Sequence, residues 1–117
     1  MCRRGTVHER LDRMFVHAIE KVTVHGDRRG CFLCNAGVDQ AGGNAATQSA
    51  VNAMMGRVQA AIEEVLVDEP RYAADAESRK RTAVALMAGY FGLRSLVRAG
   101  LPPATLDAAK ANILAMV

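Results

Sequence analysis

The stretch from Ala83 to Leu93 constrains the fold most, because its residues are apolar on nearly every side of a helix. It lies within a longer helical pattern at residues 76–99, which Asp75 or Ser78 can cap. A helix that is apolar all round must be covered on more than one side. A single domain of 117 residues with few helices has little material for such cover. The pattern therefore predicts a helix in the core and a partner subunit that shields what remains.

Two further long segments carry the apolar spacing of amphipathic helices. In residues 6–23 the apolar side chains fall on one face, and Thr6 with Glu9 forms a candidate capping box. Residues 45–67 carry an unbroken apolar stripe, and Pro70 stops this pattern because the residue before a proline avoids the α region. Both segments are predicted to be helices.

Two shorter segments complete the helical pattern. Residues 31–41 are interpreted as a short helix that Gly42-Gly43 ends. Residues 103–116 are predicted to form the last helix. Ahead of it, Gly100 is a candidate C′ glycine, and Pro102-Pro103 stops one helix and begins the next.

The composition favours helices over strands. Only 4% of the residues are aromatic and Trp is absent, so Ala, Val, Leu and Met must fill the core, and these are mostly good helix formers. We expect an all-α fold, a five-helix bundle-like domain over residues 6–117 that follows a disordered start at residues 1–5. Gly89 and Gly92 share one face of the long helix and predict a close approach of another backbone there.

Charge and hydropathy exclude several classes of protein. The net charge is +3, and the excess lies in the first thirty residues rather than on a nucleic-acid-binding surface. The run Arg79-Lys80-Arg81 is interpreted as a solvated helix start, with contact to an acidic partner as the alternative. The longest strongly apolar run, between Arg81 and Arg94, is too short to cross a bilayer. The start of the chain lacks the apolar core of a signal peptide, so a cytoplasmic location is the default expectation.

The cysteines and carboxylates do not point to catalysis. Cys31 and Cys34 have the CxxC spacing, but a metal site needs more ligands and no strand precedes them as in redox proteins. With Cys2, they are interpreted as small apolar residues, and the metal and redox alternatives are less favoured. Glu63 and Glu64 are adjacent on a helix and do not share a face. Neither an enzyme activity nor a cofactor nor a metal is therefore expected.

Two motifs, in their order and spacing, carry a family resemblance. One is the segment Gly30-Cys31-Phe32-Leu33-Cys34-Asn35, and the other is Gly92-Leu93-Arg94-Ser95-Leu96-Val97-Arg98-Ala99-Gly100. Two long helices and a short terminal helix accompany them. The chain resembles the C-terminal ligand-binding and dimerisation domain of TetR-type transcriptional regulators over roughly residues 8–117. The helix-turn-helix DNA-binding domain that opens the family's chains has no counterpart in this sequence, which contains no candidate recognition helix.

The resemblance implies a pocket for a small, largely apolar effector, enclosed by the first helices and the first half of residues 76–99. Such a pocket has mostly apolar walls and a few polar groups, and Asn35 and Tyr90 are the expected polar ones. Flexible methionine side chains suit a pocket that accepts varied ligands. The predicted wall residues are Met14, Phe15, Phe32, Asn35, Met54, Met55, Val58, Met87, Tyr90 and Phe91.

The resemblance also implies a homodimer in which residues 76–99 and 103–116 pair with their copies in a four-helix interface. Arg94, Arg98 and Lys110 are expected at its rim. The predicted interface residues are Leu93, Arg94, Leu96, Val97, Leu106, Ala109, Lys110, Ile113 and Leu114.

The expected function is that of the sensor and dimerisation half of a TetR-like regulator, without contact to a membrane. DNA binding is expected only where a helix-turn-helix domain accompanies the chain. The alternative is a helical protein–protein interaction module that uses the surface of residues 83–97 and binds no small molecule.

Overall fold

The computed structural model describes residues 5–23 and 45–117. These residues form five helices and no strand, which confirms the predicted all-helical fold for this part of the chain. The predicted helix at residues 31–41 lies outside the described residues, as do Cys2, Cys31 and Cys34 and the predicted pocket residues Phe32 and Asn35. The helices are α1 (Val7–Thr23), α3 (Ala45–Leu66), α4 (Pro70–Ala73), α5 (Ala76–Arg98) and α6 (Pro103–Leu114).

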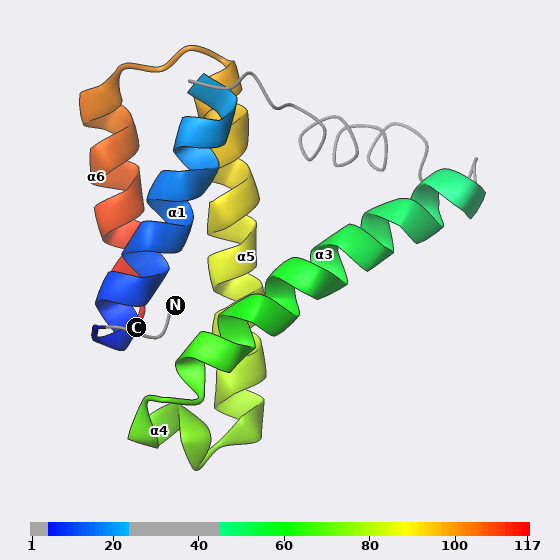
Figure 1. Ribbon diagram of the computed structural model, residues 1–117, viewed down its shortest axis with the longest axis vertical. Coiled ribbons are helices and arrows are strands. Elements are labelled where there is room, and N and C mark those ends of the chain that lie inside the picture. The colour runs from blue at the N-terminus through cyan, green and yellow to red at the C-terminus, as the bar shows by residue number, and fades with distance from the viewer. Residues whose placement is uncertain (1–4, 24–44) are drawn as a thin grey trace.

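Helix α5 is the central element of the fold. It packs against α1, α3, α4 and α6. Helices α1 and α6 flank its second half, and α3 runs in a different direction from α1 (Figure 1). This arrangement supplies within one protomer much of the cover that the apolar stretch requires. The core gathers fully buried side chains from three helices, among them Leu11, Phe15, Ile62, Leu66, Leu86 and Leu93.

The predicted capping box starts α1. The Thr6 backbone N–H donates to Glu9 Oε1 at 2.8 Å, and the Glu9 backbone N–H donates to Thr6 Oγ1 at 3.1 Å. These two bonds satisfy backbone donors that have no partner inside the helix. The bond from the Thr6 backbone N–H, followed by hydrogen bonding from the Thr6 side chain, holds the pKa of the Glu9 carboxyl below its ordinary value.

The start of α5 is capped by Asp75 rather than by Ser78. Asp75 has an extended backbone, and its carboxylate accepts a hydrogen bond from the Ser78 backbone N–H at 3.1 Å. Of the two caps that the sequence allows, Asp75 is therefore the one that this helix uses.

The end of α5 is the predicted glycine stop. Gly100 has a φ of +84° and donates to the Val97 carbonyl at 3.0 Å, while the Leu101 N–H donates to the Leu96 carbonyl at 3.3 Å. This pair of bonds is the Schellman motif, which needs the left-handed backbone that glycine adopts without strain. Pro103 then begins α6.

Only one of the two α5 glycines marks a close approach inside the protomer. A Cβ placed on Gly89 would lie 2.7 Å from Ile113 Cγ2, so the side chain of α6 occupies the space that a larger residue would need. At Gly92 no atom beyond the adjacent backbone of α5 lies within 4 Å of that position, and the residue is exposed. Gly89 has a close neighbour, but it is the Ile113 side chain and not the predicted backbone, and Gly92 has no close neighbour within the chain.

Helix α4 and the first turn of α5 correct the interpretation of the basic run. The sequence pattern did not indicate α4, a single turn that begins at Pro70. Arg79 is not solvated: its guanidinium donates to the Tyr72 carbonyl at 2.9 Å and lies 3.9 Å from a Glu63 carboxylate oxygen. Arg79, a residue of α5, therefore contacts both α4 and α3. Lys80 and Arg81 are exposed, as expected.

Two ion pairs connect α1 to the rest of the fold. Arg10, which is buried, pairs with Asp68, in the turn that follows α3, across 2.5 Å. Asp12 pairs with Lys110 of α6 across 2.9 Å. Together they fix both sides of α1, so that its apolar face turns toward α5.

The structure places most of the predicted interface residues within the packing of the single chain. Leu93, Val97, Leu106 and Leu114 are buried in the core, and Leu96, Ala109 and Ile113 pack partly buried against it. Arg94 is buried rather than at a rim, while Lys110 is half-buried against α1. These side chains do not form an open surface, because α1 already covers the face of α5 and α6 on which they lie. Arg98 is exposed.

In the described parts of the chain, the helices are too short or too polar for any one of them to cross a bilayer.

Candidate functional site: a cleft between α1 and α3

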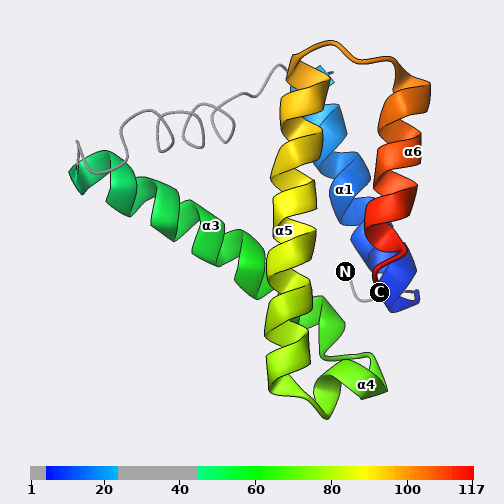
Figure 2. The ribbon, with the colours of Figure 1, turned by 180° about the vertical axis from the view of Figure 1, so that it is seen from behind.

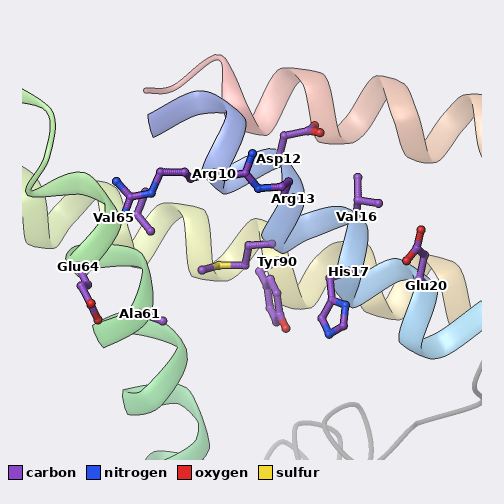
Figure 3. A pocket seen from close by; sticks show the side chains of 11 residues that line it. Arg10, Asp12, Arg13, Val16, His17, Glu20, Ala61, Glu64, Val65 and Tyr90 are labelled. Atoms are coloured by element: carbon purple, nitrogen blue, oxygen red, sulfur yellow. The ribbon is translucent and has the colours of Figure 1, made fainter. Parts of the chain in front are cut away.

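A cleft of about 810 Å³ opens where α3 diverges from α1. Helix α1 forms one wall, the end of α3 forms the other, and Tyr90 of α5 lies between them (Figure 3). The cleft exists because α1 and α3 both pack on α5 but cross it in different directions (Figure 1). The lining residues are Arg10, Asp12, Arg13, Met14, Val16, His17, Glu20, Ala61, Glu64, Val65 and Tyr90.

Tyr90 is held in place by two other aromatic rings. Its ring meets that of Phe15 edge-to-face with centroids 5.6 Å apart, and that of Phe91 in the same way at 5.2 Å. Phe15 and Phe91 are both buried. This cluster gives the cleft a rigid aromatic base and places one flat apolar surface where a ligand can stack.

A second, smaller hollow of about 230 Å³ continues the first along α3. The two share Met14, Ala61 and Tyr90. The smaller hollow adds Met54, Val58 and Arg57. The joined site therefore has an apolar middle, from Met14 across Tyr90 to Val58, with charged side chains around it.

The polar side chains at the cleft include paired residues and exposed residues of α1. Arg10 and Asp12 are engaged with Asp68 and Lys110. His17 and Glu20 are exposed on α1, and both line the cleft (Figure 3).

The structure brings together four of the predicted pocket residues and not the others that it describes. Met14, Met54, Val58 and Tyr90 line the two hollows. Phe15 and Phe91 lie behind Tyr90 instead of lining the cleft, and Met87 packs partly buried against the core. Met55 is half-buried and lines neither hollow. Apolar residues at helical spacing do not reveal by themselves which of them face a cavity.

Sequence reasoning missed the polar wall of the cleft. The amphipathic pattern of α1 assigns Arg13, His17 and Glu20 to its solvent face, and nothing in it shows that α3 lies opposite them. Ala61 and Glu64 of α3 were missed for the same reason. The only signal in the sequence was the position of Ala61 on the apolar stripe of its segment.

The carboxylates and histidines of the described residues do not assemble into a metal-binding group. No set of three His, Cys, Asp or Glu residues among them is placed to hold a metal ion. Glu63 faces Arg79 and Gln59, while Glu64 lines the cleft, so the two adjacent carboxylates have different surroundings.

A second surface, on the side of α5 and α6 away from α1, is exposed and uncharged. Between Thr82 and Leu96 every exposed residue of α5 lacks a charge, and Val84 is 46% exposed. Helix α6 lies beside α5 on that side (Figure 2). Exposed, uncharged residues also recur there at helical spacing along α6. We call this surface the outer α5–α6 face and define it by Ala85, Ala88, Gly92 and Ser95 of α5 with Thr105, Ala108 and Asn112 of α6.

Comparison of the chain with models of protein families, with curated proteins and with solved structures gives no significant match in any of the three.

Proposed function

We propose that this chain is a small-molecule sensor domain that binds a largely apolar effector between α1 and α3 and works as a homodimer. This is the function that its resemblance to the C-terminal domains of TetR-type regulators implies. DNA recognition is not part of the function proposed for this chain.

The observation that carries the proposal is the cleft on Tyr90. Its volume of about 810 Å³ falls within the usual range of small-molecule sites, roughly 300–1,000 Å³. Its apolar middle presents an aromatic ring and methionine side chains, and its rim presents a few polar groups. This is the composition expected of a site that binds an apolar body and orients it by its polar end.

Filling the cleft tests this proposal. Ala61 is exposed and lines both hollows, so Ala61→Trp places a large side chain in the site without disturbing the core. Small apolar compounds should raise the melting temperature of the native chain, because a ligand that binds only the folded state stabilises it. Ala61→Trp should abolish that increase. Ala60→Trp is the matched control, since Ala60 is exposed on the same helix and lines neither hollow.

A screen in which no apolar compound changes the melting temperature of the native chain would contradict the proposed site. So would an equal response from the Ala61 and Ala60 variants.

The homodimer is proposed to form through the outer α5–α6 face instead of the buried residues that the family resemblance implies. The small residues Ala88 and Gly92 leave room for a second pair of helices to approach closely. The face also carries no charge that would have to be desolvated in the interface. A two-fold arrangement brings this face against its own copy, which satisfies the self-complementarity of an isologous interface.

Sedimentation at a series of concentrations tests the dimer. The native chain should sediment as a dimer, and Ala88→Glu should shift it to the monomer because two like charges would meet near the two-fold axis. Ala60→Glu, on α3, is the control for adding one charge elsewhere. A folded native chain that stays monomeric at every concentration, or an Ala88→Glu variant that stays dimeric, would contradict this part of the proposal.

Helix α5 connects the two parts of the proposed function. Tyr90 is at the base of the cleft, and Ala88 and Gly92 lie on the outer face of the same helix. A ligand that prefers one position of α5 therefore favours one arrangement of the two copies, and the dimer in turn changes the affinity for the ligand by the same factor.

A further inference from the structure

Arg94 is a buried cation without a counter-ion among the residues that the structure describes. It is 8% exposed, its Nε has no hydrogen-bond partner, and no described carboxylate lies within ion-pair distance of it. Arg10, the other buried arginine of this part of the chain, is 7% exposed and pairs with Asp68. The two residues are buried to nearly the same extent, and only one of them is neutralised by a described acidic group.

A guanidinium group keeps its charge at any pH at which a protein folds, so Arg94 cannot relieve its burial by losing a proton. An unpaired buried charge is strongly destabilising, and its donors remain available to an acceptor. The burial of Arg94 without a described counter-ion is therefore what we expect of a guanidinium that pairs with an acidic ligand.

Arg94 lies beside Tyr90, the aromatic residue at the base of the cleft, and lines neither hollow itself. It follows Tyr90 by one turn of α5, and its guanidinium carbon is 5.9 Å from the centroid of the Tyr90 ring. The same ring forms part of the wall of both hollows. The Tyr90 ring thus connects the wall of the two hollows with the Arg94 guanidinium.

We propose that the effector is an amphipathic organic acid whose carboxylate pairs with Arg94 while its apolar body lies along Met14, Tyr90 and Val58. The planar guanidinium can donate two parallel hydrogen bonds to a carboxylate, which gives such a pair both strength and orientation. This inference rests on the proposed function, because it names the class of ligand for the same cleft.

Calorimetric titration with decanoate and with 1-decanol tests the inference on the native chain. The two probes share an apolar chain and differ in the head group. Decanoate should bind at least about tenfold more tightly than decanol, the difference expected for a charge-assisted pair in a buried site. Arg94→Met should abolish this preference and leave decanol binding unchanged, while Arg94→Lys should retain part of it. Arg98→Met is the matched control, since Arg98 is exposed one turn further along α5.

The stability of the ligand-free protein provides an independent readout. If Arg94 has no partner, Arg94→Met removes an uncompensated charge and should raise the melting temperature, whereas breaking a structural pair would lower it. The native protein should also gain more stability from decanoate than the Arg94→Met variant does.

The outcomes separate the two proposals. Binding of decanol together with equal binding of decanoate, or a lower melting temperature for Arg94→Met with the decanoate preference intact, overturns the role of Arg94 and leaves the cleft as a neutral site. Failure of both probes to bind the native chain overturns the proposed function of the cleft and this inference with it.

Discussion

At the scale of single residues, Gly89 shows how one missing side chain sets the distance between two helices. The space that its Cβ would need is filled by Ile113, whose branched side chain has few alternative rotamers. The approach of α6 to α5 therefore depends on a glycine, although glycine weakens a helix interior by about 1 kcal/mol relative to alanine.

We expect Gly89→Ala and Gly56→Ala to have opposite effects on stability. A Cβ added to Gly56, in α3, would meet no atom within 4 Å, so alanine there should stabilise the protein by about 0.5–1 kcal/mol through helix propensity. Gly89→Ala should destabilise it by about 1 kcal/mol, because overpacking against Ile113 outweighs the same gain. Urea unfolding of both variants measures the two signs, and a stabilising Gly89→Ala would show that Ile113 moves aside without cost.

Glu9 is expected to contribute to the pH dependence of stability. Its pKa is lower in the folded chain than its ordinary value of 4.5, so the unfolded state binds more protons between the two values. The contribution is present above 4.5 and is lost as the pH falls through the lowered pKa. Glu9→Gln should flatten the loss of stability in that acid range, as followed by thermal unfolding between neutral pH and the acid limit. Glu77→Gln, in the first turn of α5, controls for the loss of one negative charge, and identical acid profiles for both variants would contradict the prediction.

At the scale of elements, each end of α5 is fixed by residues that are close in sequence. Asp75 satisfies a backbone donor at the start, and Gly100 allows the last carbonyls to be satisfied at the end. The long central helix thus has defined limits before any other helix packs on it.

Removal of the Asp75 cap should cost about 1 kcal/mol. Asp75→Ala leaves the Ser78 backbone donor without its partner, whereas Asp75→Ser preserves a cap and should lose little. Chemical denaturation of the two variants measures the difference. Equal stabilities would mean that water replaces the carboxylate without loss.

At the scale of the whole molecule, the fold is a set of helices organised around α5. Helices α1, α3, α4 and α6 each contact it, while the ion pairs Arg10–Asp68 and Lys110–Asp12 hold α1 against α3 and α6. The described start of α3 has few buried residues, and Val51 is the first of them.

Hydrogen exchange should follow this arrangement. The amides of α5 from Leu86 to Leu93 should exchange most slowly, because they open only when the contacts with several helices are lost. The amides of residues 45–50 should exchange much faster, since the start of α3 is exposed on most of its surface. Mass spectrometry of peptic fragments distinguishes the two regions, and equal protection would show that α3 is held along its whole length.

Features that depend on neighbours within one or two helical turns could be predicted from the sequence. The limits of the four long helices, the Thr6–Glu9 capping box and the glycine stop at Gly100 follow from propensities and from hydrogen bonds between residues at most five positions apart. An apolar stripe also shows that one face of a helix is covered, whatever covers it.

Contacts between residues far apart in the sequence, in contrast, could be seen only from the packing of the helices. Leu93 and Leu114 belong to the protomer's own core, Arg10 finds Asp68 fifty-eight positions away, and Arg94 is buried beside Tyr90. The cleft likewise depends on the angle between α1 and α3 where both pack on α5. The physical reason is that apolar attraction is not directional, so a stripe of Leu, Val and Ala specifies burial without specifying the partner. The choice among partners is made by the shape of the whole packed molecule.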